Sequence, residues 1–286
     1  MTESFSVDLG GTKTAAARIA NGRIEARLQS PTEAQAGFEA QLDALSALVA
    51  DLGFRKGDRL GVAVAGRVDA AGCWGAVNAG TLPGIRGEPL LDRLRDRFGA
   101  RVSVINDAAA AALAEARLGA GVGADHFAYL TISTGVGGGI VLDGKLLQSR
   151  NGMAGHVGFI STFLGRDRCG SGRVGTVESV ASGRAIAAMA GTPDAQAAFA
   201  SDTDLSRAAI DRSAAAVAGL CADLTAIFGL DRIAMGGSIG LARGYLARVG
   251  ARLDDEPPLF RVPVVSASLG HDSALLGALL SERAAS

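Results

Sequence analysis

Short apolar runs separated by turn-forming residues open the chain. Short apolar runs at 4–10, 14–20 and 22–30 alternate with turns, and the pair Asn21-Gly22 stands between the second run and the third. An Asn-Gly pair between two β-like runs is a strong signal for a tight hairpin. The opening of the chain is therefore predicted to form consecutive antiparallel strands.

Two further kinds of hydrophobic pattern alternate along the rest of the chain. Apolar residues at spacings of three and four predict helices at 32–51, 88–98, 176–190, 205–228, 238–252 and 273–283, the last with Asp272 as N-cap, and an alanine-rich helix after residue 107. Continuous or alternating apolar runs predict strands at 59–66, 100–107, 126–135, 138–145, 231–237 and 262–267.

Strands that alternate with helices indicate an α/β protein with largely parallel sheets. Each half of the chain also begins with an apolar strand, a glycine turn and a second apolar strand. We interpret this as a weak internal duplication with its boundary near Asn106, and expect a ligand site in a cleft between two lobes.

Composition and charge exclude several classes of protein. The 286 residues include 28 basic and 29 acidic side chains, so the net charge of −1 provides no basic surface for nucleic acid or anionic membrane. Apolar residues make up 48%, without a run long enough for a membrane span, and the N-terminus shows no secretory signal. Three separated cysteines argue against a disulfide framework. We expect a soluble cytoplasmic protein.

The 40 glycines gather in a few short motifs, each next to an apolar run. In the first motif, Asp8 and Leu9 are followed by Gly10, Gly11, Thr12 and Lys13. Backbone N–H groups of such a turn can face a phosphate while Asp8 helps to hold hydrated Mg²⁺. An ordinary glycine hairpin capped by Asp8 explains the same residues equally well.

The second motif is the run of residues 133–139, STGVGGG, at the end of a predicted strand. Two hydroxyls followed by closely spaced glycines suit a turn that wraps anionic oxygens with backbone donors. A flexible hairpin turn is the alternative, although such turns rarely need so many glycines. We favour phosphate binding here.

Two further motifs each allow a functional and a structural interpretation. Asn106-Asp107 ends a buried strand and begins a helix, so that Asp107 can act as a general base or simply cap the helix; taken alone, the cap is favoured. The run 236–240, GGSIG, joins a predicted strand to a helix. Its glycines allow a flat heterocycle to lie against the backbone, or merely make a tight connection.

The order of these motifs resembles the ROK family of sugar kinases, which have the actin-like ATPase (ribonuclease H-like) fold. The resemblance runs nearly end to end and is carried by DLGGTK (8–13), INDAAAAALAE (105–115), STGVGGG (133–139) and GGSIG (236–240). Within the family, the segments 154–158, 175–188, 236–247 and 270–280 are most similar to bacterial N-acetylmannosamine kinases, which typically have histidine at position 156 where other members have glutamate.

This resemblance implies a fold, a reaction and a set of site residues. It implies two lobes around an inter-lobe cleft, 1–105 completed by the C-terminal helix 272–286, and 106–271. It implies a homodimer that uses ATP and Mg²⁺ to phosphorylate the 6-hydroxyl of N-acetylmannosamine in sialic acid breakdown. Asp107 is then the general base, and the sugar is bound by Gly66, Asn106, Asp107, His156 and Glu178. The nucleotide and its Mg²⁺ are bound by Asp8, Gly10, Gly11, Thr12, Lys13, Thr134, Gly135, Val136, Gly137, Gly138, Gly236 and Gly237.

The chain departs from the family at its zinc site. Of the family's one histidine and three cysteine ligands only Cys169 is present, because Phe159, Ser171 and Thr176 stand at the other three positions. Phenylalanine and hydroxyl side chains cannot complete a tetrahedral zinc site, so we expect no zinc. We expect Phe159, Phe163 and Leu164 to pack this loop hydrophobically instead.

Alternative functions remain to be weighed. Phe159, and Thr81 where an asparagine commonly contacts substrate, leave a glucokinase or another hexose kinase as the main alternative. A non-catalytic sugar sensor is a further alternative, although the presence of Asp8, Asp107 and both glycine turns argues against it. Family repressors carry an N-terminal helix-turn-helix domain, for which the residues before Asp8 leave no room.

Overall fold

The computed structural model describes residues 3–78, 80–99 and 101–281. The chain divides into two compact units, which are described separately. Unit 1 comprises Met1–Ala114, Gln148–Ala154 and Asp272–Ser286, and unit 2 comprises Glu115–Leu147 and Gly155–His271. The boundary that the sequence placed after residue 105 falls nine residues later, within a helix, and the short segment 148–154 belongs to unit 1. The expected cleft between the lobes stays a prediction.

Unit 1 is built on a five-stranded mixed sheet with the order β3-β2-β1-β4-β8. The first three strands pair antiparallel, while β1, β4 and β8 run parallel. Their bounds are β1 Ser4–Leu9, β2 Lys13–Ala20, β3 Arg23–Pro31, β4 Arg59–Val64 and β8 Val102–Asn106. The predicted Asn21-Gly22 hairpin is confirmed, with positive φ angles of 52° and 73° at its two turn residues.

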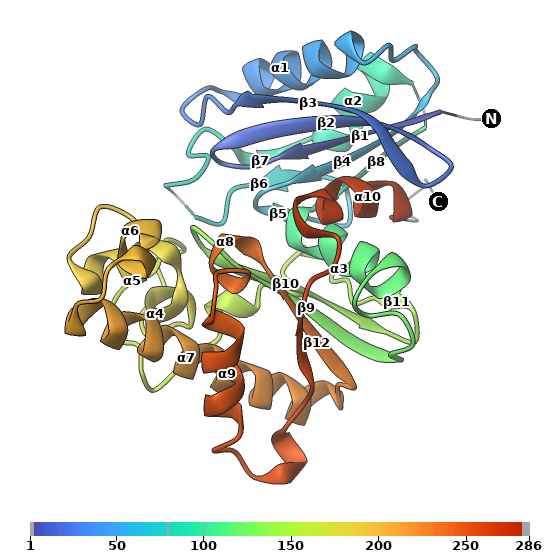
Figure 1. Cartoon of the computed structure of the whole chain (residues 1–286). Helices are drawn as coiled ribbons and strands as arrows, with labels where there is room; N and C mark the ends of the chain where they lie inside the picture. Colours follow the sequence, from blue (N-terminus) through green and yellow to red (C-terminus); the bar gives the residue numbers. More distant parts are fainter. Residues whose placement is uncertain (1–2, 79, 100, 282–286) are drawn as a thin grey trace. The chain divides into compact units, whose positions relative to one another are not determined.

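Helices cover both faces of this sheet (Figure 1). Helices α1 (Phe38–Asp51) and α2 (Leu90–Phe98) bury their apolar side chains with Phe5, Val7 and Leu9 of β1. On the other face, α10 (Ser273–Leu280) packs against β1 and β4. This double cover explains why Leu60–Val64 of β4 is continuously apolar and why β8 is largely apolar. A small three-stranded sheet, β5 Arg67–Val68, β6 Trp74–Gly75 and β7 Arg86–Glu88, completes unit 1 and was not predicted.

Unit 2 repeats the layout of the first sheet. Its order is β11-β10-β9-β12-β13, again with three antiparallel strands followed by two parallel ones. The bounds are β9 His126–Ile132, β10 Val136–Leu142, β11 Lys145–Leu146, β12 Arg232–Gly236 and β13 Val264–Ser266. The repeated topology confirms the predicted duplication. Both sheets are mixed, however, and the expectation of largely parallel sheets was wrong because each unit begins with a hairpin.

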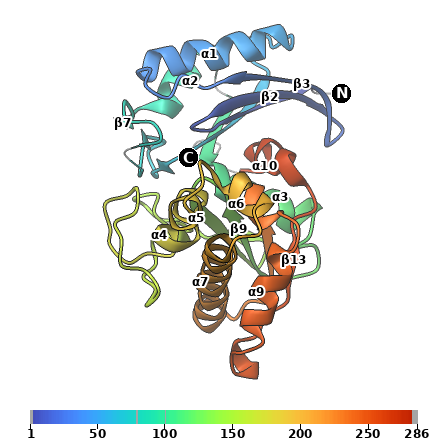
Figure 2. The ribbon, with the colours of Figure 1, turned by 60° about the vertical axis from the view of Figure 1, so that its left-hand side comes forward.

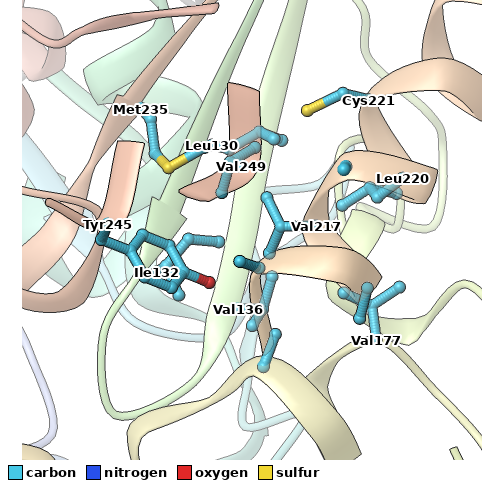
Figure 3. Packing of buried hydrophobic residues seen from close by; sticks show 14 of the residues in the cluster. Leu130, Ile132, Val136, Val177, Val217, Leu220, Cys221, Met235, Tyr245 and Val249 are labelled. Carbon is cyan, nitrogen blue, oxygen red and sulfur yellow. The ribbon is translucent and has the colours of Figure 1, made fainter. Parts of the chain in front are cut away.

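The helices of unit 2 pack against one face of its sheet. The long helix α7 (Asp204–Phe228) lies beside α9 (Tyr245–Leu253), as Figure 2 shows. Together with the strands they enclose a core that includes Leu130, Val217 and Met235 (Figure 3). Within that core the Ser213 hydroxyl lies 2.6 Å from the Tyr245 hydroxyl, so that both buried polar groups are paired.

Several predicted helices have different bounds or are broken. Helix α1 begins at Phe38 rather than at residue 32. The stretch 176–190 forms α4 (Glu178–Ala181) and α5 (Gly183–Ala190), because Ser182 has extended backbone and caps α5. The remaining helices are α3 Asp107–Leu118, α6 Ala195–Ala200 and α8 Gly237–Gly240, with short 3₁₀ turns at Val157–Phe159, Pro258–Phe260 and Gly270–Asp272. No helix in the described part of the chain could span a membrane.

Candidate active site

Three parallel strands of unit 1 end together and bring separate motifs to one sheet edge. In the strand register, Leu9 of β1 pairs with Val64 of β4, and Val64 pairs with Asn106 of β8. The residues that directly follow β1, β4 and β8 therefore lie side by side at this edge of the sheet. The glycine turn after Leu9 and the Asn106-Asp107 motif, far apart in sequence, lie in one place.

The turn between β1 and β2 is closed by a hydrogen bond from the Gly10 N–H to the carbonyl of Lys13, at 3.0 Å. A Cβ atom at Gly11 would lie 2.4 Å from Cγ2 of Thr81, so only glycine fits beside that side chain. Thr12 and Lys13 are exposed. The turn thus presents a narrow backbone surface with a hydroxyl and a cation beside it, as a phosphate-binding turn requires.

The structure assigns the helix cap to Asn106 rather than to Asp107. The side-chain Oδ1 of Asn106 accepts a hydrogen bond from Ala109 N at 2.9 Å, which is the usual N-cap geometry. Its amide donates to Gly66 O and to Asp107 Oδ1, each at 2.8 Å. Asp107 is the first residue of α3, and its Oδ1 also accepts from Ala108 N at 2.8 Å. These bonds fix the orientation of the Asp107 carboxylate.

Both carboxylates at this edge are held at unusually high pKa values. Burial raises the pKa of Asp107 to about 6, although hydrogen bonds from Ala108 and Asn106 act in the opposite direction. Burial, and then the negative charge of Asp107, raise the pKa of Asp8 to about 7 against the effects of Lys13 and Arg27. Two neighbouring carboxylates with shifted pKa values are typical of functional sites.

Gly66 lies at the same edge and requires glycine. Its φ of 105° is unfavourable for other residues, and a Cβ there would lie 2.6 Å from the carbonyl oxygen of Gly75. The preceding residue is also fixed, since Trp74 Nε1 donates to Ala65 O at 2.8 Å. Gly66 therefore packs closely against Gly75, and its carbonyl oxygen accepts the hydrogen bond from Asn106.

In unit 2, the parallel pairing of β9 and β12 likewise joins two glycine motifs. Gly236 pairs with Thr131 in the register, and the Ser133 and Ser238 hydroxyls lie 3.1 Å apart. A Cβ at Gly237, where φ is 83°, would lie 2.4 Å from the carbonyl oxygen of Ile132. The turn after β9, with Thr134 exposed, and the start of α8 thus lie against each other.

Glu178 connects this turn to the start of α4. It is only 5% exposed, and its Oε2 accepts from Val136 N at 3.2 Å. A Cβ at Gly135 would lie 2.7 Å from the same oxygen, so glycine is needed for this approach. Burial raises the pKa of Glu178, partly offset by the Val136 hydrogen bond and the charge of Arg184. Its Oε1 has no hydrogen-bond partner among the described residues, and such a buried oxygen is suited to bind a ligand hydroxyl.

The remaining site residues that were predicted in unit 2 are Gly137, Gly138 and His156. Gly138 is covered by Val157, since a Cβ there would lie 2.9 Å from a Val157 methyl. The half-buried His156 ring stacks against Phe159, with ring centroids 6.0 Å apart and planes at 20°. Gly137 lies between Val136 and Gly138 on β10. Ser238 was not predicted as a site residue from the sequence, although its hydroxyl directly follows the glycine pair and could have indicated it.

The residues at the family's zinc positions do not fit zinc. Among the described residues, no group of three or more His, Cys, Asp or Glu side chains could hold a metal ion. The predicted hydrophobic packing of this loop is partly wrong. Phe163 is 90% exposed, whereas Leu164 packs against the core of unit 2 and Phe159 against His156.

Comparison with known proteins identifies the family. The family model described as the ROK family matches residues 4–283. The chain is 41% identical over 285 residues to an N-acetylmannosamine kinase of Escherichia coli, covering 97% of each chain. It is 38% identical to one of Haemophilus influenzae, covering 96% of this chain and 93% of that one.

A solved structure shows the same fold. A ROK family glucokinase from Streptomyces griseus, in complex with glucose and AMPPNP, superimposes with a TM-score of 0.82 at 29% identity, covering 97% of this chain and 98% of the other. The expected α/β class and actin-like ATPase fold are thereby confirmed. The family match over nearly the whole length and the 41% identity to a full-length relative lead to one conclusion: the chain belongs to the ROK family.

Proposed function

We propose that this protein is an N-acetylmannosamine kinase, which transfers the γ-phosphoryl group of ATP to the 6-hydroxyl of the sugar. The observation that carries this proposal is Asp107, a carboxylate of raised pKa held in a fixed orientation at the sheet edge beside Asp8. The names of the relatives supply the substrate class.

The chemistry assigned to Asp107 is general-base catalysis. With a pKa of about 6, the carboxylate is ionised at neutral pH but more basic than an ordinary aspartate. It can therefore orient the sugar 6-hydroxyl and accept its proton as the oxygen attacks phosphorus. Its Oδ1 is held by Asn106 and Ala108, which fixes the carboxylate for this role.

Backbone groups provide the proposed nucleotide site. In unit 1, Gly10, Gly11, Thr12 and Lys13 would face the phosphates; in unit 2, the turn from Thr134 to Gly138 would do the same. The adenosine is assigned to Gly236 and Gly237, whose lack of side chains lets the start of α8 lie close against Tyr129 and Ile132 of β9. Fixed backbone donors stabilise phosphoryl charge without needing to reorient.

Asp8 suits the Mg²⁺ that accompanies the nucleotide. Mg²⁺ commonly keeps several water ligands and is held by one or two carboxylates together with phosphates, so a single partly buried carboxylate is a sufficient protein contribution. A bound Mg²⁺ would neutralise phosphate charge. Because a cation favours the ionised form of a neighbouring carboxylate, it would also lower the high pKa of Asp8.

The proposed sugar contacts are Asn106, Glu178, His156 and the backbone of Gly66. The buried, unpaired Oε1 of Glu178, assessed among the described residues, is the strongest of these, because a buried acceptor without a partner is costly unless a ligand supplies the donor. Phe159 and Thr81 replace polar family residues. These departures and the likeness to a glucokinase make hexose phosphorylation the second candidate function.

A comparison of substrates tests the proposal. ADP release should be measured with N-acetylmannosamine, N-acetylglucosamine, glucose and fructose at saturating ATP and Mg²⁺. We expect kcat/KM for N-acetylmannosamine to exceed the others by about tenfold or more. A preference for glucose would instead establish the second candidate, and no turnover with any sugar would favour a sugar sensor.

The Asp107→Asn variant tests the general base. Asparagine keeps an oxygen that can accept from Asn106 and Ala108, so the variant should fold and bind sugar. We expect kcat to fall by about 10²–10⁴-fold, the usual contribution of a positioned base. Asp254→Asn, at an exposed position, is the matched control and should retain full activity. Near-normal turnover of Asp107→Asn would remove the basis of the assignment.

The family resemblance adds three proposals that concern the cellular setting. They are a role in sialic acid breakdown, a cytoplasmic location and a homodimeric assembly without nucleic acid. Light scattering of the purified protein would test the homodimer.

A further inference from the structure

Three of the four positions of the family's zinc ligands, Cys169, Ser171 and Thr176, lie close together. Cys169 is 8% exposed and Thr176 is fully buried. Cys169 Sγ lies 3.0 Å from Ser171 Oγ, and the Thr176 side chain lies close enough to the thiol to lower its pKa. Three of the four positions therefore form one buried polar cluster around a sulfur atom.

The Cys169 thiol and the Ser171 hydroxyl are hydrogen-bonded to each other, and either group can be the donor. Thr176 Oγ1 accepts from Ser179 N at 3.2 Å, which fixes the Thr176 hydroxyl within the protein. Hydroxyl side chains therefore stand at the two positions at which the family has further zinc-bound thiolates.

The backbone of the loop is closed without any metal. Thr162 N donates to Gly175 O at 2.8 Å, and Val177 N donates to Ile160 O at 2.9 Å. Farther along the loop, Cys169 N donates to Arg173 O at 2.8 Å. The two arms of the loop are therefore paired as in an irregular hairpin, which leads directly into Glu178.

The fourth position has become an apolar contact. Phe159 stacks on His156, and the neighbouring Ile160 packs against the core of unit 2. A histidine ligand is thus replaced by a ring that contacts a residue of the proposed sugar site. Each of the four positions thus makes a contact within the protein that needs no metal.

We propose that residues 159–176 are a metal-free replacement of the zinc loop, in which the Cys169–Ser171–Thr176 cluster and the Phe159–His156 stack hold the loop in place of the ion. In zinc-dependent loops, metal binding supplies folding energy and chelators remove it. In this protein that energy comes from side-chain and backbone contacts. The inference concerns the loop's stability and is independent of which sugar the enzyme uses.

Metal content and chelation provide the first test. The wild-type protein should contain less than about a tenth of an equivalent of zinc, and 1,10-phenanthroline should leave its melting temperature unchanged. The variant Phe159→His/Ser171→Cys/Thr176→Cys should take up about one zinc ion, and its melting temperature should fall on chelation. One zinc per wild-type chain, or a triple variant that folds but takes up none, would overturn the proposal.

Substitutions of the cysteine provide the second test, with Cys221 as the matched control. Both thiols are buried, but the pKa of Cys221 is raised by burial alone, to about 12. At residue 169, serine should be more stable than alanine because it can keep the hydrogen bonds. At residue 221, serine should be no more stable than alanine, because its hydroxyl would be buried in an apolar core. Serine and alanine of equal stability at residue 169 would contradict the cluster's role.

Trypsin gives a local readout of the same loop. Arg166, Arg168 and Arg173 are exposed and lie within it. Cleavage there should be slow in the wild type, equally slow with 1,10-phenanthroline, and faster in Cys169→Ala than in Cys221→Ala. Faster cleavage of the wild type on chelation would show that a metal holds the loop.

Discussion

At the scale of single residues, the most informative feature is the pair Asp8 and Asp107. The sheet register places both carboxylates at one edge. Burial raises the pKa of each, so that the ionised form of either carboxylate lowers the stability of the folded protein. A structural role would not need two neighbouring acids with raised pKa values. Their arrangement is better explained by a reaction that needs a base and a cation site.

The raised pKa of Asp107 predicts a pH-dependent gain in stability for Asp107→Asn. Because the pKa rises from 3.8 to about 6 on folding, the folded protein binds this proton more tightly than the unfolded chain. The stability that Asp107 contributes is therefore lost as the pH rises from about 4 to about 6. Without ligands, the variant should exceed the wild type by about 3 kcal/mol at pH 8, and this difference should disappear near pH 4.

Thermal melts from pH 4 to pH 8 check this prediction. Asp254→Asn serves as the control because its carboxylate is exposed, and its difference from the wild type should be small at every pH. A wild type that is more stable than Asp107→Asn at pH 8 would show that burial of this carboxylate costs no stability.

The sequence identified site residues better than their exact roles. The glycines at 11, 135 and 237 were found in glycine motifs next to apolar runs, and Gly66 was implied by the family resemblance; the structure gives each of the four a close approach that excludes a side chain. The cap was assigned to Asp107, whereas Asn106 holds it, because adjacent polar residues are not distinguished by pattern alone. Phe163 was expected to pack, but its 90% exposure depends on tertiary structure that no local pattern encodes.

At the scale of elements, continuous strands were predicted well and interrupted helices poorly. A buried parallel strand is recognised by an unbroken apolar run, as in β4, or by a largely apolar one, as in β8. The predicted helix at 238–252 is instead interrupted between α8 and α9, where Gly244 has a φ of 80°. The apolar spacing continues across such breaks, so periodicity does not reveal them. The two-residue strands β5 and β6 are too short to show any period.

Two glycines inside helices should respond oppositely to the same substitution. Gly219 lies in α7, and a Cβ there would meet no atom within 4 Å, so Gly219→Ala should stabilise by about 0.5–1 kcal/mol. Gly277 lies in α10, and a Cβ there would lie 1.7 Å from the carbonyl oxygen of Ala110. Gly277→Ala should therefore destabilise by about 1–3 kcal/mol or more, through forced separation of α10 from α3.

Urea unfolding of the two variants and the wild type measures both effects, and each variant is the other's control. Equal effects of the two substitutions would contradict the close packing of α10 on α3. The comparison isolates packing, because helix propensity favours alanine at both positions.

At the scale of the whole molecule, the chain's two ends are joined in one unit. Unit 1 begins with β1 and is completed by α10, which is separated from β1 by all of unit 2. Ser103 Oγ donates to Ala278 O at 3.0 Å, and Arg59 donates to Leu279 O at 2.5 Å. Unit 1 therefore cannot complete its core until nearly the whole chain has been synthesised.

The only tryptophan makes this dependence measurable. Trp74 is fully buried in the core of unit 1, so its fluorescence reports the unfolding of that unit.

Leu275 of α10 is also fully buried, packed with Ala15, Ala17 and Ile19 of β2. Leu275→Ala should destabilise unit 1 by about 2–5 kcal/mol and lower the fluorescence-monitored melting temperature by several degrees. Leu259→Ala is the control, because Leu259 is 88% exposed and its loss should leave the midpoint nearly unchanged. If Leu275→Ala left the melting temperature of the tryptophan transition unchanged, the packing of α10 would not contribute to the stability of unit 1.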